Sequence, residues 1–217
     1  KTVFELIRTR TITPDIVHCH DWHTGLLVSL VARIHADDTR TRADGFRVGL
    51  RSSPRKSAIP PKVVYTIHNL ANQGKTKHEN LMAEGIRHAD FVTTVSPTYA
   101  REIQTRSYGE GLDALVRTRA RERRLTGILN GIDYDFWDPE TDRLLPSQYS
   151  AKTLDKKFEN KVRLVEALKL HSVEAPLVGL VSRLTVQKGI DFVTPLIETC
   201  IERYGAQFVF LGEGAPE

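Results

Sequence analysis

The sequence predicts an α/β protein in which parallel β-strands are joined by helices. Short apolar runs rich in β-branched residues alternate with longer segments of helical periodicity along most of the 217 residues. Such alternation is typical of βαβ units, whose right-handed crossovers return the chain to a neighbouring parallel strand. Polar clusters directly follow several of the predicted strands, and ligands of such sheets bind beyond the carboxyl ends of the strands. The pattern therefore predicts both a fold class and the edge at which a ligand would bind.

The first half of the chain contains three predicted strands, each with a helical pattern after it. The predicted segments are, in order, a strand over 16–20, a helix over 24–36, a strand over 62–68, a helix over 79–89 and a strand over 91–95. Residues 37–61 have no steady period and are rich in Arg, Ser and Pro, which predicts a loop. Ser96 and Pro97 suit the N-cap and first position of a further helix that continues to Gln104.

The second half repeats this alternation. The predicted segments are a strand over 125–129, a helix over 153–170, a strand over 177–181, a helix over 190–203 and a strand over 207–211. Asn130 and Gly131 form a turn dipeptide at the end of the first of these strands. Pro195 falls within the predicted helix over 190–203, where it would cost a hydrogen bond unless it lies in the first turn.

Composition and charge are those of an ordinary globular protein, with 40% hydrophobic and 27% charged residues. No apolar run is long enough to span a bilayer, so no membrane partner is expected. The two cysteines, Cys19 and Cys200, suit a reducing compartment and predict neither a disulfide framework nor a Cys-type zinc site. The net charge of +4 is concentrated in basic runs over 33–62 and 117–124. We interpret these runs as a solvated loop and a solvated helix face, and we expect no nucleic-acid partner.

The first polar cluster covers residues 18–23 and contains three histidines. His18 and His20 would share one face of a strand and could chelate a metal, but no matching distant ligand pair is evident, so we expect no metal. A buried, hydrogen-bonded structural histidine is the alternative for His18. Asp21 and His23 lie beyond the predicted strand end and are better placed to bind a polar ligand by hydrogen bonds.

Two further clusters could hold other parts of a ligand. His68 and Asn69 open a polar loop whose groups can bind hydroxyls, with a turn-stabilising role as the alternative for Asn69. Arg183 and Lys188 lie in a strand-to-helix loop, where both could reach a diphosphate beside helix N-terminal amides. Such cations would stabilise the charge on a departing nucleotide. The loop is not a Walker motif, and two unrelated surface cations are the alternative.

Taken in order, these clusters resemble the motifs of the glycogen/starch synthase family. The matching segments are VHCHDWH at 17–23, YTIHNLA at 65–71, TTVSPTYA at 93–100, GILNGID at 127–133 and SRLTVQKG at 182–189. The tryptophan, aspartate and proline at 137–139 match a further step of the family pattern. Each motif is modest by itself, but the ordered set is highly specific and extends over nearly the whole chain.

The resemblance implies two Rossmann-like domains of GT-B type, both incomplete in this chain. Residues 1–126 would be the later part of the N-terminal, acceptor-side domain, and residues 127–217 the first part of the C-terminal, nucleotide-sugar-binding domain. Members of the bacterial and plastid type are retaining glucosyltransferases that add glucose from ADP-glucose to the non-reducing end of α-1,4-glucan. They need no metal or other cofactor. The implied location is the cytoplasm, or the plastid in a plant or alga.

The resemblance also implies roles for individual residues. The expected catalytic residues are His68, Arg183 and Lys188. The expected substrate-binding residues are Asp21, His23, Asn69, Arg183 and Lys188. Arg183 and Lys188 would hold the diphosphate of the donor, and His68 would stabilise the developing sugar cation through its backbone carbonyl.

Three departures from the family pattern limit what this chain is expected to do alone. The Lys-x-Gly-Gly-Leu donor loop is absent, and the sequence ends before the family's Glu-x7-Glu region. The segment over 74–79 is shorter and the segment over 37–61 longer than is usual in the family, and Asn72 stands where a tyrosine is common. We therefore expect negligible synthase activity from the 217 residues by themselves. The alternatives are another glycosyltransferase of GT-B type, such as a sucrose synthase-like enzyme, and a non-catalytic glucan-binding remnant.

Overall fold

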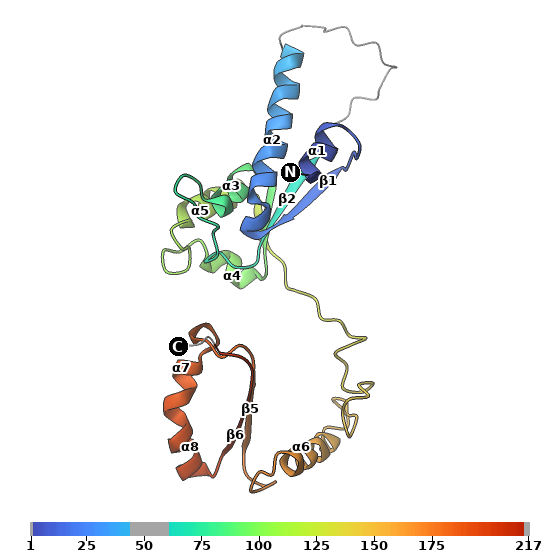
Figure 1. Cartoon of the computed structure of the whole chain (residues 1–217), viewed down its shortest axis with the longest axis vertical. Helices are drawn as coiled ribbons and strands as arrows, with labels where there is room; N and C mark the ends of the chain where they lie inside the picture. Colours follow the sequence, from blue (N-terminus) through green and yellow to red (C-terminus); the bar gives the residue numbers. More distant parts are fainter. Residues whose placement is uncertain (1, 44–60, 215–217) are drawn as a thin grey trace. The chain divides into compact units, whose positions relative to one another are not determined.

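The computed structural model describes residues 2–43 and 61–214, with side chains undescribed over 35–43. The chain divides into two compact units, residues 1–131 and 132–217 (Figure 1). Each unit is an α/β structure with a parallel sheet, as the sequence predicts. The units are described separately below.

The first unit contains a four-stranded sheet with the order β1-β2-β3-β4. Its strands are β1 (Ile16–His20), β2 (Lys62–Ile67), β3 (Phe91–Thr94) and β4 (Leu125–Gly127). Every neighbouring pair is parallel, and the register places His20 beside Thr66 and Thr66 beside Thr93. The carboxyl ends of β1 and β2 therefore lie together at one edge of the sheet.

The described residues of the first unit form five helices. They are α1 (Thr2–Arg8), α2 (Asp21–Ala43), α3 (Leu81–His88), α4 (Pro97–Glu102) and α5 (Asp113–Arg121). The predicted cap of α4 is confirmed, because the side chain of Ser96 accepts a hydrogen bond from the backbone N–H of Tyr99 and Pro97 occupies the first turn. The loop prediction is wrong over 37–43, where α2 continues, and its remainder over 44–60 lies outside the described residues.

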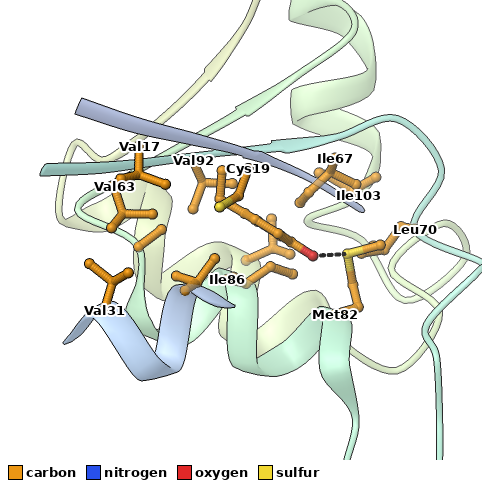
Figure 2. Close-up of a cluster of buried hydrophobic side chains, with 14 of the residues drawn as sticks. Val17, Cys19, Val31, Val63, Ile67, Leu70, Met82, Ile86, Val92 and Ile103 are labelled. Carbon is orange, nitrogen blue, oxygen red and sulfur yellow. Dashed lines mark hydrogen bonds between the residues drawn. The ribbon is translucent and has the colours of Figure 1, made fainter. Parts of the chain in front are cut away.

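The core of the first unit lies between the sheet and α2, α3 and α5 (Figure 2). Tyr65 at its centre is fully buried, and its hydroxyl donates to the sulfur of Met82 at 3.2 Å. Helices α2 and α3 approach closely at Gly25, where a Cβ atom would lie 1.9 Å from the carbonyl oxygen of Leu81. Only glycine allows this contact, because it has no Cβ.

One member of the second basic run is not solvated. Arg119 on α5 is only 6% exposed, donates to Glu122 at 2.7 Å and also donates to the carbonyl oxygen of Ala89. Burial lowers the pKa of this guanidinium, while Glu122 opposes the shift. The interpretation of this run as a solvated helix face is therefore wrong for Arg119, although Arg121 on the same helix is exposed.

The second unit has a two-stranded parallel sheet of β5 (Leu177–Val181) and β6 (Gln207–Leu211). Its helical segments are α6 (Asp155–Ala167), η1 (Val186–Lys188), α7 (Ile190–Val193), η2 (Thr194–Leu196) and α8 (Ile197–Tyr204). The single helix predicted over 190–203 is interrupted at Pro195, which lies in a 3₁₀ turn because proline cannot donate the helical hydrogen bond.

Both cysteines are free thiols. Burial raises the pKa of the Cys19 thiol, which lies in the core of the first unit. Within residues 2–43 and 61–214, none of the helices has the length and apolar character needed to cross a membrane.

Candidate active site

The edge formed by the ends of β1 and β2 brings two predicted site residues into contact. Asp21 directly follows β1, His68 directly follows β2, and the Asp21 carboxylate accepts a hydrogen bond from the backbone N–H of His68 at 2.8 Å. The main chain of Asp21 has a φ of 52°, in the left-handed region that costs a non-glycine residue roughly 1–2 kcal/mol. The bond to His68 compensates for that conformation, and it fixes the peptide that enters His68.

Two imidazole rings meet at the same edge. Nδ1 of His20 lies 3.0 Å from Nε2 of His68, although the two residues are 48 positions apart in the sequence. Burial lowers the pKa of His20, and the charges of His18 and His68 act in the same direction, while Asp21 opposes them. His20 therefore favours its neutral form, in which one ring nitrogen donates and the other accepts.

A chain of hydrogen bonds supports this histidine pair from the face of the sheet. The ring of His18 lies 4.3 Å from that of His20, centroid to centroid. Nε2 of His18 is 2.7 Å from the hydroxyl of Thr66, which is 2.6 Å from the hydroxyl of Thr93. These hydrogen bonds cross β1, β2 and β3. His18 therefore has the hydrogen-bonded structural role considered for it, but its side chain is exposed rather than buried as that alternative expected.

The other two predicted residues of this unit take part in local packing. The ring of His23 stacks on Trp22 at 3.9 Å and is exposed. The side-chain oxygen of Asn69 accepts a hydrogen bond from the backbone N–H of Ala71 at 3.0 Å, so its turn-stabilising role is also observed. Neither contact tests the predicted binding of a substrate by His23 and Asn69.

Residues that the sequence analysis did not select hold the loop that follows β2. Gly74 has a φ of 58°, and a Cβ there would lie 2.3 Å from the ring of Trp22. The hydroxyl of Tyr99 on α4 accepts a hydrogen bond from the backbone N–H of Leu70 at 3.1 Å. Burial raises the pKa of Tyr99. Trp22 and Tyr99 both lie within the matched motifs, and this was the feature of the sequence that could have predicted their role in holding the loop.

Arg183 and Lys188 lie in the second unit, in the segment that follows β5. Its backbone is fixed to the segment after β6, because Ser182 N–H donates to Leu211 O at 3.1 Å and Leu184 N–H donates to Glu213 O at 2.8 Å. Gly212 permits this approach, since a Cβ there would lie 1.7 Å from Ser182 O. The two cations are exposed on a fixed backbone.

The side chains of these cations are held less firmly than the backbone beneath them. Arg183 donates to the side-chain oxygen of Gln187 at 3.4 Å, a long hydrogen bond between exposed groups. Lys188 ends the 3₁₀ turn η1, and Gly189 follows it with a φ of 77°. The arrangement presents two positive charges beyond the carboxyl end of a parallel strand, a position suited to an anionic ligand.

Among the side chains that the structure describes, no group of three or more His, Cys, Asp or Glu residues could hold a metal ion. His18 instead bonds to the hydroxyl of Thr66, and His20 bonds to His68.

The fold and these sites define the class of protein. It is a parallel α/β protein with polar side chains, suited to bind a ligand, beyond the carboxyl ends of its strands. A family model described as the starch synthase catalytic domain matches residues 1–44 and 46–118. The chain belongs to this family. The resemblance stated from its motifs is thereby confirmed.

Relatives match almost the whole chain. It is 41% identical over 231 residues to a glycogen synthase of Gloeobacter violaceus, covering 100% of this chain and 44% of that protein. It is 38% identical over 225 residues to a glycogen synthase of Yersinia pestis, covering 93% of this chain and 42% of that protein. The chain therefore spans less than half the length of these relatives.

A solved structure is similar as well. The catalytic domain of starch synthase IV from Arabidopsis thaliana, bound to ADP and acarbose, matches with a TM-score of 0.78 and 32% identity, covering 99% of this chain and 45% of that one. The predicted fold class, α/β with Rossmann-like units of GT-B type, agrees with this match and with the parallel sheets.

Proposed function

We propose that this chain carries parts of the active site of a retaining glucosyltransferase that transfers glucose from ADP-glucose to the non-reducing end of α-1,4-glucan. The observation that carries the proposal is the bond between Asp21 and His68 at the carboxyl edge of the first sheet, where the two matched motifs meet. The glycogen synthase relatives, and the starch synthase structure bound to ADP and acarbose, support this substrate class. They favour it over the non-catalytic alternative.

In this proposal the first unit binds the sugar. Asp21 holds the peptide that enters His68, so the carbonyl of His68 has a fixed direction and can stabilise positive charge on the transferred glucose. The side chains of His68, Asn69 and His23 supply directional hydrogen bonds to sugar hydroxyls. Such positioning is the main contribution that a protein makes to a transfer between two bound substrates.

The second unit binds the nucleotide diphosphate in this proposal. Arg183 can contact two phosphate oxygens through its planar guanidinium, and Lys188 adds a compact charge on a flexible stem. Together they stabilise the negative charge that develops on the departing ADP. The proposed domain assignment follows, with residues 1–126 on the acceptor side and 127–217 on the nucleotide-sugar side.

The proposed transfer uses no metal or cofactor, since Arg183 and Lys188 would supply the positive charge at the diphosphate. The proposed partners are the ADP-glucose donor and the α-1,4-glucan acceptor. The proposed location is the cytoplasm, or the plastid in a plant or alga, and immunofluorescence of the native protein checks it.

Titration calorimetry with ADP-glucose tests the assignment of the nucleotide site. Arg183→Ala and Lys188→Ala should each weaken binding to the 217-residue chain by about tenfold, as expected for a lost charge-assisted hydrogen bond. Arg203→Ala, which removes an exposed cation on α8, is the matched control and should leave the affinity unchanged. Equal binding by all four forms would contradict the proposal.

A donor competition separates the proposal from other GT-B transferases. Unlabelled ADP-glucose should displace a labelled ADP ligand more effectively than UDP-glucose does. Preference for UDP-glucose would favour the sucrose synthase-like alternative. Glucan elongation by the 217 residues alone should stay at the background rate, and a measurable rate would overturn the expectation of negligible activity.

A further inference from the structure

His20 contacts His68 but has no role in the function proposed above. It is the last residue of β1, and its Nδ1 lies 3.0 Å from Nε2 of His68. The two rings are 5.3 Å apart between centroids and inclined by 31°. Because the contact joins ring nitrogens, it fixes the side chain of His68, whereas Asp21 fixes its backbone.

We propose that His20 is a positioning residue that sets the tautomer and ring orientation of His68. The bond occupies Nε2 of His68 and leaves Nδ1 as the ring nitrogen that contacts a hydroxyl of the bound sugar. This inference rests on the proposed function for the identity of the ligand. It adds a determinant of sugar binding outside the predicted site residues.

The hydrogen bond requires complementary tautomers. One of the two nitrogens must carry a proton and the other must offer a lone pair, so the two rings cannot both point an N–H at the contact. The bond therefore ties the tautomer of His68 to that of His20, so that of the two ring nitrogens outside the contact one is a donor and the other an acceptor. Without His20, His68 could exchange between tautomers, and a sugar hydroxyl would select one of them at a cost in binding free energy.

Neighbouring side chains contact the ring of His20 and limit its movement. Its ring rests against His18, whose Nε2 is 2.7 Å from the hydroxyl of Thr66 on the neighbouring strand. The titratable groups that act on His20 are His18 on its own strand, His68 after β2 and Asp21 at the start of α2. The groups around the ring of His20 thus come from three different segments of the first unit.

Nitrogen NMR of the imidazoles in the full 217-residue chain tests the inference directly, since it has only eight histidines to assign. At a pH above the histidine range, His68 should show one protonated and one unprotonated ring nitrogen. His20→Phe keeps an aromatic ring but removes the bond, so the two His68 shifts should move toward their average. His20→Asn offers an amide nitrogen near the position of Nδ1 and should restore a single tautomer.

Binding of a maltooligosaccharide gives the second measurement. His20→Phe should weaken it by about five- to tenfold, and His20→Asn should recover most of that loss. His78→Phe, at an exposed histidine of the same unit, is the matched control and should change neither measurement. Thermal unfolding of each variant checks that the unit remains folded.

The two measurements have separate consequences. Unchanged His68 shifts in folded His20→Phe would overturn the positioning role, whatever the chain binds. Loss of the single tautomer in His20→Phe and its recovery in His20→Asn would support that role. Absence of maltooligosaccharide binding in the unsubstituted chain would instead count against the proposed function.

Discussion

The two units hold their candidate site residues in different ways. In the first unit, the backbone of His68 is bonded to Asp21 and its ring to His20, above a fully buried core. In the second unit, Arg183 and Lys188 are exposed, as His20 and His68 also are, but the hydrogen bond of Arg183 to Gln187 is 3.4 Å long. In the first site the backbone and the ring of His68 are both held in fixed directions. In the second site only the backbone is fixed, and the side chains can adapt.

This difference corresponds to what each proposed ligand requires. Hydroxyls of a sugar are recognised by hydrogen bonds with narrow angular limits, so the groups that bind them must be oriented beforehand. A diphosphate is recognised mainly by charge, which long cationic side chains supply from several positions. The comparison therefore predicts that small changes in packing lower the stability of the first unit more than that of the second.

The largest expected effect comes from the core of the first unit. Tyr65→Ala removes a fully buried ring and should lower the free energy of unfolding by about 3–5 kcal/mol. Tyr108→Ala, at a tyrosine that is 57% exposed, is the control and should change it by less than about 0.5 kcal/mol. Urea unfolding followed by the fluorescence of Trp22, in a Trp137→Phe background, reports on the first unit.

A second pair of substitutions compares the units directly. Gly25→Ala would place a Cβ 1.9 Å from Leu81 O and should cost about 3 kcal/mol, because helix backbones must separate. Gly179→Ala on β5 meets no atom within 4 Å and should be nearly neutral. The same unfolding measurement is used for Gly25, and circular dichroism of the whole chain for Gly179. Equal costs at both glycines would contradict the contrast between the units.

The fold was predictable where residues have strong local preferences. The strands over 16–20, 177–181 and 207–211 have the predicted bounds, because apolar residues form most of the last two and the buried positions of the first, and polar or glycine-rich segments end them. Pro195 interrupts its helix for a reason visible in the sequence, since it cannot donate a backbone hydrogen bond.

Features that depend on distant contacts were not predictable in the same way. The first residue of α2 is Asp21 rather than Thr24. The left-handed conformation of Asp21 is accompanied by a hydrogen bond to His68, 47 positions along the sequence, which the local pattern does not reveal. Arg119 looks like a surface cation in the sequence, and only the carbonyl of Ala89 and the carboxylate of Glu122 explain its burial. The contact of His20 with His68 likewise needs the register of β1 and β2.

A smaller effect is expected at the start of α2. Asp21→Ala loses the bond to His68 and keeps the unfavourable φ, so it should cost about 1–2 kcal/mol. Asp21→Gly also loses the bond but relieves the backbone strain, so it should cost less than Asp21→Ala. The amide proton shift of His68 should move in both variants. A greater loss of stability in Asp21→Gly would show that strain is absent at this position.

The smallest expected effect is a pH dependence confined to the first unit. The pKa of His20 is lowered in the folded chain, so the unfolded chain binds more protons and stability must rise with pH. The contribution of His20 to the free energy of unfolding is complete above its pKa in the unfolded chain, about 6.5. It is lost as the pH falls through the lower pKa that His20 has in the folded chain. Urea midpoints of Trp22 fluorescence should therefore fall on acidification in the Trp137→Phe background, and less so with His20→Asn added. If the chains with and without His20→Asn lost stability equally, the titrating group would lie elsewhere. A neutral His20 would then make no contribution to the stability of the first unit.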